Sequence, residues 1–363
     1  MKLVASICIT ALSIISVAAG SCQKEAEQED MSAYLMVYFH DSDHDLHYAI
    51  SEDGYTFTAL NDNKPVILGD TIADQHGIRD PHIYRGPDGK FYMALTDLHI
   101  FAKDEGLRDS VWERPAEYGW GNNRGIVLMK SDDLIHWTHN EARLDQLFPV
   151  EYSEIGCAWA PETIYDPEAQ KMMVYFTIRT RGERLPGGSD VEKKTRLFYA
   201  YADDDFTTLT SKPALLYEYP DSNMQILDAD ICPMPDGRYM MSYVAQEWPE
   251  CGIKVAYSDH INRGYDYNPT QVDAEKVACE APTVWKRIGE DKWVLMYDVF
   301  GVQPHNFGFV ETTDFKTFTP LGHFNEGVMK TTNFQSPKHG AVVQITASEA
   351  ARLKEAYPTK DLQ

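Results

Sequence analysis

Cysteine is scarce in this sequence, and two common functional motifs are missing. Six cysteines occur among 363 residues, and the spacing of the four in the expected folded region matches no metal-binding motif. These four are Cys157, Cys232, Cys251 and Cys279. We expect buried free thiols, with a disulfide as the alternative. The sequence also has neither a glycine-rich phosphate loop nor a zinc-binding helix motif, so the usual signatures of nucleotide and zinc sites are absent.

Basic residues are also few. Lys and Arg number 33 against 56 Asp and Glu, which gives a formal net charge of −23 at pH 7. A surface this acidic repels nucleic acids and polyanionic polysaccharides. We therefore expect a neutral binding partner and no nucleic acid.

The first 22 residues have the pattern of an export signal. Lys2 is followed by an apolar stretch, Ile7–Val17, that is too short to span a membrane, and then by small residues that end at Cys22. This pattern resembles the lipobox of bacterial lipoproteins, in which the cysteine is lipidated. We expect residues 1–22 to be a lipoprotein signal peptide ending at the lipidated Cys22, and residues 23–32 to be a flexible, polar tether. The protein would then be an exported bacterial lipoprotein anchored in the outer membrane, facing the periplasm or the cell surface. An ordinary cleaved signal is the alternative.

A strand-like motif recurs five times in the rest of the chain. Runs of aromatic and β-branched residues start at Ala33, Lys90, Lys171, Arg238 and Lys292, and each is followed by a second run with an acidic turn. Four copies are preceded by a third run, whereas the copy at Ala33 has none. The missing run appears near the other end of the chain, as HGAVVQIT from His339.

This repeat predicts the fold. Units of roughly 50 or more residues with about four strands each are typical of β-propeller blades. A C-terminal innermost strand that joins three N-terminal strands would close the ring and leave no open sheet edge. We expect residues 33–363 to form an all-β domain, a five-bladed β-propeller closed by a blade shared between the N- and C-terminal segments. A two-sheet β-sandwich is the alternative.

Carboxylates stand where several innermost strands begin. In a propeller these strand starts converge at one end of the central channel, and here they carry Asp80, Asp228, Glu280 and His339. Taken singly, each acidic residue could belong to a turn or a solvent-facing loop. Three carboxylates facing one cleft repel one another and raise some of their pKa values, which no fold needs for stability. We therefore predict a functional site.

The motifs around these residues are similar to those of a known family. The chain resembles glycoside hydrolase family 43, whose members are five-bladed β-propellers. The resemblance implies that Asp80 is the general base, that Asp228 orients the acid and tunes its pKa, and that Glu280 is the general acid. The motifs that carry it are RDPHIYRGPDGKFYM from Arg79, WAPETIY from Trp159, ILDADICPMPDGRYMMSY from Ile226 and EAPTVWK from Glu280.

The resemblance also implies an activity. We expect an inverting glycosidase that removes α-L-arabinofuranosyl or β-D-xylosyl units, in an exo manner, from neutral plant polysaccharides or oligosaccharides. No cofactor is required. In related propellers a histidine at the position of His339 helps to hold a hydrated cation, often calcium, so a structural calcium ion in the channel is one interpretation of His339. A satisfied structural side chain is the other.

Substrate contacts are expected from the connections between second and third strands, since all of these lie on the face where the innermost strands begin. Aromatic rings suit the apolar faces of sugars, and arginine can bind hydroxyl groups in a fixed geometry. An aromatic residue could instead pin its own loop. The predicted substrate-binding residues are Trp120, Arg124, Trp159, Glu162, Asp230 and Trp248.

Two other functions remain open at this point. One is a sugar-binding propeller lipoprotein without catalytic activity, although binding alone does not need three carboxylates. The other is a fructan-cleaving propeller glycosidase, which the strings around Asp80 and Glu280 slightly resemble. Such enzymes carry an Asn-Asp-Pro motif, and none precedes Asp80 here.

Overall fold

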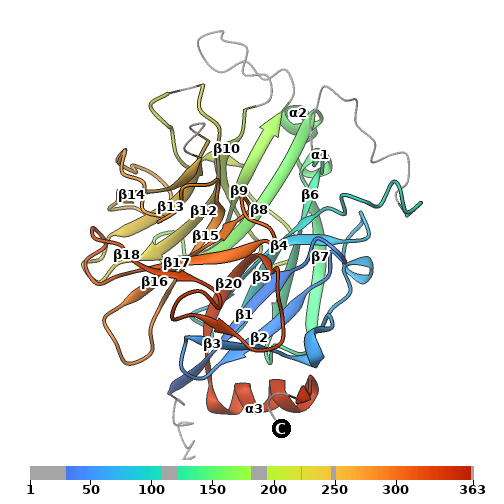
Figure 1. Cartoon of the computed structure of the whole chain (residues 1–363). Coiled ribbons are helices and arrows are strands. Elements are labelled where there is room, and N and C mark those ends of the chain that lie inside the picture. Colours follow the sequence, from blue (N-terminus) through green and yellow to red (C-terminus); the bar gives the residue numbers. More distant parts are fainter. Residues whose placement is uncertain (1–29, 108–120, 181–193, 222, 247–250, 361–363) are drawn as a thin grey trace, which may run out of the picture.

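The computed structural model of the chain describes residues 30–107, 121–180, 194–221, 223–246 and 251–360. These residues form five mainly antiparallel sheets arranged in a ring, which is a five-bladed β-propeller (Figure 1). The innermost strands of the sheets contact one another in order around the ring, and the last contacts the first. The predicted fold class is confirmed.

The first two complete blades follow each other along the chain, and every strand is named from the channel outward. The first contains β4 (Ile78–Arg85), β5 (Phe91–Asp97), β6 (Gly125–Ser131) and β7 (Trp137–Arg143). The second contains β8 (Ile155–Asp166), β9 (Lys171–Thr180), β10 (Arg196–Tyr201) and β11 (Ala214–Leu215).

The third and fourth blades also run outward from the channel in chain order, with three strands in the third blade and four in the fourth. The third contains β12 (Ile226–Pro233), β13 (Tyr239–Ala245) and β14 (Gly252–Ser258). The fourth contains β15 (Glu280–Lys286), β16 (Trp293–Val299), β17 (Asn306–Thr312) and β18 (Thr319–His323).

The closing blade combines the two ends of the described chain. From the channel outward it contains β20 (Lys338–Thr346), β1 (Met31–Phe39), β2 (His47–Ser51), β3 (Thr56–Ala59) and β19 (Lys330–Thr331). β1 and β20 are antiparallel, with Leu35 opposite Val343. The predicted shared blade is confirmed, and its first strand begins two residues before the expected start of the domain.

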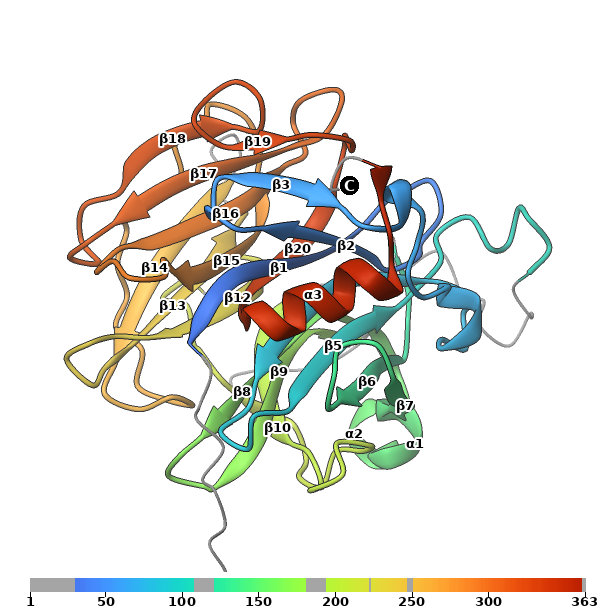
Figure 2. The ribbon, with the colours of Figure 1, turned by 90° about the horizontal axis from the view of Figure 1, so that it is seen from below.

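Helices are short and lie outside the blades. The described helices are η1 (Asn61–Asn63), η2 (Gly69–Thr71), α1 (Leu144–Leu147), α2 (Pro149–Tyr152) and α3 (Ala347–Ala356). α3 directly follows β20 and crosses one end of the ring (Figure 2). Thr346 and Glu349 form a capping box at its start, and Glu349 also pairs with Arg85 of β4. The sequence analysis did not anticipate this helix.

The hydrophobic core is divided into five clusters, one between each pair of adjacent blades. On β5, Met93 packs toward the closing blade, whereas Tyr92 and Ala94 pack toward the second blade. On β1, Leu35 and Tyr34 likewise face opposite neighbours. Because each second strand is buried on both faces, its sequence is a continuous apolar run rather than an alternating one. This burial explains the repeated motif.

The second strands end on the face where the innermost strands begin, as expected, although most residues of the predicted long loops lie outside the described residues. The end of the second strand pairs with the start of the innermost strand in each of the four complete blades, as Asp97 does with Ile78 and Asp298 with Glu280. The connections that leave the second strands therefore rise where the innermost strands begin.

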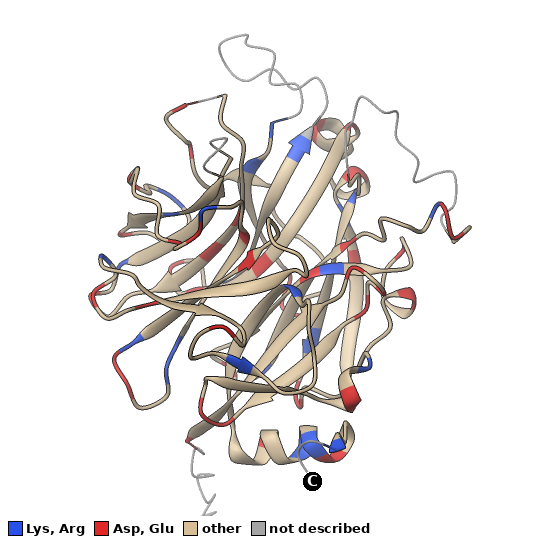
Figure 3. Cartoon of the chain, viewed as in Figure 1, with Lys and Arg blue, Asp and Glu red and all other residues tan. Residues whose placement is uncertain are grey.

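The state of the cysteines agrees with expectation over the described ranges. The four cysteines there are buried and free, as predicted. Along the ribbon in Figure 3, Lys and Arg positions are scattered among the Asp and Glu positions, which are more numerous in the sequence. No helix in this part of the chain is long and apolar enough to cross a membrane.

Candidate active site

The five innermost strands share a backbone irregularity near their starts. One residue in each has a positive φ, and the ladder to the second strand is interrupted beside it. The φ angles are 52° at Asp80, 44° at Ala160, 53° at Asp228, 54° at Ala281 and 27° at His339. Such bulges redirect side chains, and left-handed non-glycine residues cost energy that folds retain mostly at functional sites. The repeat seen in the sequence therefore extends to the backbone.

The positions of these residues show that Glu280 is not equivalent to Asp80, Asp228 and His339, contrary to what the sequence had suggested. Asp80, Asp228 and His339 occupy the left-handed position, but in β15 that position belongs to Ala281. Glu280 lies one residue earlier, where the closing blade has Lys338. The sequence comparison aligned the strands by their carboxylates and could not detect the offset, because the motif gives no direct sign of backbone conformation.

All three predicted catalytic carboxylates nevertheless line one cavity of about 380 Å³, together with His339 and Trp159. The other lining residues are Arg79, Leu98, Arg179, Thr195, Gln225, Leu227, Gln246 and Phe300. The convergence expected from the propeller geometry is therefore present.

Asp80 is held as a carboxylate. Thr96 Oγ1 donates a hydrogen bond of 2.7 Å to its Oδ2, and His339 Nδ1 lies 3.1 Å from its Oδ1. Burial alone would raise the pKa of Asp80, but the charge and hydrogen bond of His339, with help from Arg79 and Thr96, hold that pKa well below its ordinary value. Asp80 can therefore accept a proton from water.

Asp228 and Glu280 have pKa values shifted in the opposite direction. Burial, together with the negative charges of Glu280 and Asp80, raises the pKa of Asp228 to about 8, although His339 opposes the shift. Burial also raises the pKa of Glu280, with Asp298 and Asp80 adding to the shift and Lys338 and His339 opposing it. Both carboxyl groups therefore keep a proton to higher pH than an ordinary carboxyl group.

His339 links the closing blade to its neighbours. Its ring contacts Asp80, and its backbone N–H donates a hydrogen bond of 3.3 Å to Asp298 Oδ2. Burial would lower the pKa of His339, but Asp80, Asp228 and Glu280 raise it above its ordinary value. With Nδ1 turned to Asp80, Nε2 is the ring nitrogen available to a cation, which is the usual arrangement of a metal-binding histidine.

Trp159 lies on the wall of the cavity, as the sequence analysis expected. Its Nε1 donates a hydrogen bond of 2.8 Å to the carbonyl oxygen of Gly121, and the guanidinium of Arg179 stands 4.7 Å from the centre of its ring. These contacts fix the plane of the indole. A fixed aromatic plane beside the carboxylates is a suitable surface for the apolar face of a sugar.

Two predicted substrate-binding residues are placed differently. Glu162 and Asp230 lie two residues beyond the left-handed position, one layer deeper in the channel, and do not line this cavity. Tyr175 donates a hydrogen bond of 2.8 Å to Glu162, and the backbone N–H of Val284 donates one of 2.6 Å to Asp230. A strand advances by about 3.3 Å per residue, which places both side chains below the catalytic cavity, and their predicted contact with substrate stays untested.

This deeper layer also contains His82, and the three side chains are close enough to suggest a metal site. The donor set does not fit one. The backbone N–H of Thr163 donates a hydrogen bond of 3.2 Å to His82 Nδ1, so Nε2 carries the proton of the neutral ring and points at Glu162, 3.7 Å away. Burial keeps the ring neutral by lowering the pKa of His82 to about 3. Burial also raises the pKa of Asp230 to about 7 and that of Glu162 further, so these two carboxyl groups share a proton instead.

Arg124 does not line the catalytic cavity either, since its guanidinium lies 3.5 Å from Asp145. Trp120 and Trp248, the remaining predicted substrate contacts, lie outside the described residues. Their predicted role is untested.

Several residues of the site were missed from the sequence. Arg79 and Arg179 supply positive charge to the cavity. Lys338 forms ion pairs with both Glu280 and Asp298. A signal existed for Arg79 and Lys338, which immediately precede two predicted site residues. Asp298 gave none, because it ends an otherwise apolar run.

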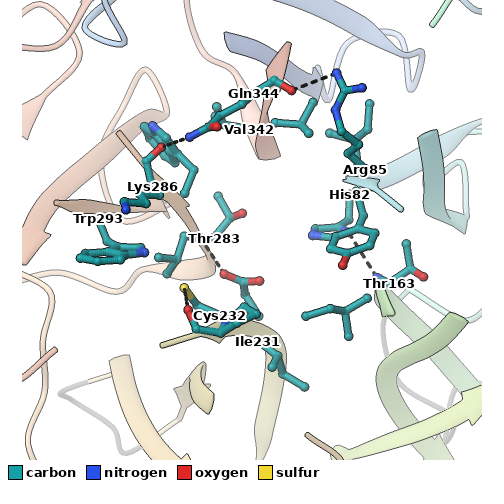
Figure 4. A pocket seen from close by; sticks show the side chains of 18 of the residues that line it. His82, Arg85, Thr163, Ile231, Cys232, Thr283, Lys286, Trp293, Val342 and Gln344 are labelled. Atoms are coloured by element: carbon teal, nitrogen blue, oxygen red, sulfur yellow. Dashed lines mark hydrogen bonds between the residues drawn. The ribbon is translucent and has the colours of Figure 1, made fainter. Parts of the chain in front are cut away.

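A second cavity, of about 560 Å³, opens at the far end of the channel (Figure 4). Side chains from the later halves of the innermost strands surround it, including Arg85, Ile231, Lys286 and Val342. None of the three catalytic carboxylates lines it. The three proposed catalytic carboxylates are thus confined to the smaller cavity.

Comparison with known proteins identifies the family of the chain. A family model described as a probable glycosyl hydrolase domain, related to family 43, matches residues 29–351. An α-L-arabinofuranosidase of Bifidobacterium longum subsp. longum is 26% identical over 133 residues, which cover 35% of this chain and only 11% of that protein.

Solved structures give the same architecture. An endo-1,4-β-xylanase of Bacteroides thetaiotaomicron has a TM-score of 0.53 at 12% identity, over 80% of this chain and 91% of that one. An endo-arabinase of the same organism has a TM-score of 0.52 at 14% identity, over 81% and 94%. These two likenesses concern the fold. Because the matching family model spans all five blades, the chain belongs to the glycoside hydrolases related to family 43.

Proposed function

We propose that this protein is a glycosidase that inverts the anomeric configuration and removes α-L-arabinofuranosyl or β-D-xylosyl units, in an exo manner, from plant polysaccharides or oligosaccharides. The observation that carries the proposal is the separation of pKa values within one cavity. Asp80 is held ionised, whereas Asp228 and Glu280 are held protonated to higher pH. An inverting glycosidase needs this pairing of base and acid.

The proposed roles follow from that separation. Glu280 donates its proton to the leaving oxygen as the glycosidic bond breaks. Asp80 accepts a proton from the water molecule that attacks the sugar from the opposite face. Asp228 stands between them in the ring and accepts a hydrogen bond of 3.3 Å from the N–H of Ala281, next to Glu280. This contact with the backbone beside Glu280 is the basis for its proposed role in orienting the acid, and the pKa values of the two groups are linked because the charge of Glu280 raises that of Asp228.

Two further observations support the sugar and the exo mode. The partial likeness to an arabinofuranosidase favours a pentose. A cavity of about 380 Å³ is near the small end of the range for ligand sites, about 300 to 1,000 Å³, which favours one or two sugar units over a long groove. Trp159 supplies one wall of this space.

Hydrolysis of p-nitrophenyl α-L-arabinofuranoside and p-nitrophenyl β-D-xyloside tests the proposal. Asp80→Ala and Glu280→Ala should each lower kcat about 10²- to 10⁴-fold, the usual contribution of a general acid or base. Asp259→Ala, which removes an exposed carboxylate, is the matched control and should leave kcat unchanged. Undiminished activity in both catalytic variants would contradict the assignment.

Two further measurements define the reaction. The anomer released first, observed by NMR, should have the configuration opposite to that of the substrate. Release of fructose from inulin or sucrose, without pentose release, would instead favour the fructan-cleaving alternative. Membership of a glycosidase family and the separated pKa values speak against a purely sugar-binding role.

Attachment to the membrane is a separate proposal. It rests on the lipobox-like sequence that ends at Cys22, which lies outside the described residues. The expected localisation is the outer membrane, facing the periplasm or the cell surface. Cys22→Ala should move the protein from the membrane fraction to the soluble fraction, and an unchanged distribution would refute the anchor.

A structural calcium ion held through His339 remains a proposal as well. The hydrogen bond from Nδ1 to Asp80 leaves Nε2 oriented for such a role, while the raised pKa of the ring favours the protonated form, which binds no metal. Elemental analysis of the purified protein decides between a neutral, metal-binding His339 and a protonated one. A stoichiometric metal would show that the ring is neutral.

A further inference from the structure

Lys338 is a buried cation next to the proposed general acid. It is the first residue of β20, and only 4% of its surface is exposed. Its Nζ lies 2.7 Å from Asp298 Oδ2 and 3.3 Å from Glu280 Oε1. Asp298 is fully buried and stands opposite Glu280 in the pairing of β15 with β16. The three side chains therefore join the fourth blade to the closing blade at the edge of the catalytic cavity.

Two contacts with one carboxylate hold Lys338 in place. Asp298 Oδ2 accepts the N–H of His339, the residue that follows Lys338, and the same oxygen faces the Lys338 ammonium. Burial alone would lower the pKa of Lys338, but Asp298 and Glu280 raise it above its ordinary value. The side chain is therefore charged, and both its backbone and its head are fixed relative to Glu280.

The chemistry of an ammonium group assigns the proton of Glu280. An ammonium donates three hydrogen bonds and accepts none, so it cannot face a protonated oxygen favourably. Glu280 Oε1 receives the Lys338 ammonium, and the acidic proton must then be on Oε2. We propose that Lys338, anchored by Asp298, is a positioning residue that holds Glu280 by Oε1, presents the proton on Oε2, and stabilises the carboxylate left after proton transfer.

This inference deepens the proposed function and rests on it. In the step concerned, the proton passes from Glu280 Oε2 to the glycosidic oxygen, which keeps the electron pair of the breaking bond to the anomeric carbon. Before the step, the charges of Lys338 and Asp298 balance. After it, Lys338 also faces the new negative charge on Glu280, so its attraction is greatest when the proton has left. The other charged or titratable groups near Glu280 are His339 of β20, Asp80 of β4, Asp228 of β12 and Cys251 beside β14.

A series of aryl glycosides of the sugar that the enzyme cleaves provides the test. Dinitrophenol leaves without protonation, whereas unsubstituted phenol needs a proton from the acid. Lys338→Met, which keeps the length of the side chain and removes the charge, should lower kcat/KM for the phenyl glycoside about 10-fold more than for the dinitrophenyl glycoside. Lys338→Arg keeps the charge and should restore most of the difference.

Removing Lys338 alone leaves Asp298 buried without its partner, which can prevent folding. The double variant Lys338→Met with Asp298→Asn removes both charges and keeps an acceptor for the His339 N–H. It should show the same leaving-group dependence as Lys338→Met.

An equal loss for all leaving groups in a folded variant would overturn the positioning role and leave the proposed function intact. A wild-type protein that cleaves none of the glycosides would overturn both.

Discussion

Asp80 and Asp228 occupy the same position in two innermost strands and have the same backbone conformation, yet their pKa values shift in opposite directions. The difference lies in their neighbours. Asp80 is next to His339 and receives the hydroxyl of Thr96. Asp228 faces the carboxyl groups of Glu280 and Asp80 and receives a single backbone N–H from Ala281. The division between base and modulator is therefore made by adjacent blades rather than by the strand that carries each residue.

Asp228→Asn should stabilise the fold in a pH-dependent way. The unfolded chain ionises Asp228 near pH 4, whereas the folded chain ionises it only near pH 8. Between these values the folded state binds more protons, so the contribution of Asp228 to stability falls as pH rises through this window. Asparagine has no such penalty and keeps an acceptor for the Ala281 N–H.

The melting temperature of Asp228→Asn relative to wild type, measured by calorimetry, should therefore increase from about pH 5 to about pH 8 and then level off. A difference that stays constant across this range would show that Asp228 is ionised in the folded protein.

At the scale of elements, hydrogen bonds from the left-handed residues join each innermost strand to the neighbouring blade. The N–H of Ala160 donates to Thr96 on β5, and that of Asp228 donates to Thr177 on β9. At the equivalent place on β13 stands Val244, which has no side-chain acceptor, and here the Asp228 carboxylate itself accepts the N–H of Ala281. A residue of the proposed site thus completes the connection between two blades, which links the geometry of the site to the packing of the ring.

The deeper layer joins strands in the same manner, and Asp230 offers a test of its structural role. Asp230→Ala removes the acceptor of the partly buried Val284 N–H between β12 and β15 and should cost about 1–3 kcal/mol in the free energy of unfolding. Asp230→Asn keeps an acceptor and is the matched control.

Urea unfolding measures the cost for both variants, and kcat of the alanine variant should remain within a few-fold of wild type below its melting range. If Asp230→Ala abolished activity while leaving stability unchanged, Asp230 would be a substrate contact after all.

At the scale of the whole molecule, closure of the ring distributes stability over five interblade clusters. β20 contributes Ala341 and Ile345 to one cluster and Val342 to another, so its loss exposes the core on both sides of the closing blade. The first and fourth blades would also lose their shared neighbour.

A chain that ends before Ala341 should therefore fail to form a closed propeller and should lose activity, although Asp80, Asp228, Glu280 and His339 all remain. A chain that ends at Lys360 keeps every described element and is the control. Circular dichroism and thermal unfolding check the fold, and hydrolysis checks the site. Full activity in the shorter chain would contradict the role of closure.

The blade count, the shared blade and the three carboxylates could all be predicted from the sequence. Each depends on a local and repeated signal. Second strands such as β5 and β16 are buried on both faces, so they appear as unbroken apolar runs that recur once in each blade. Asp80 and Glu280 mark strand starts, which a propeller must bring together.

Only the tertiary structure decided which side chain faces which at the centre of the ring. Left-handed residues shift the pairing locally, so Glu280 aligns with Lys338 rather than with Asp80, and Asp230 lies one layer below the cavity. A shift of one residue changes the direction of a side chain without changing the hydrophobic pattern. The sequence by itself determined the ring and its acidic strand starts, because those follow from composition and period. The pairing of Lys338 with Asp298 behind the acid depended on contacts between blades, which no local pattern encodes.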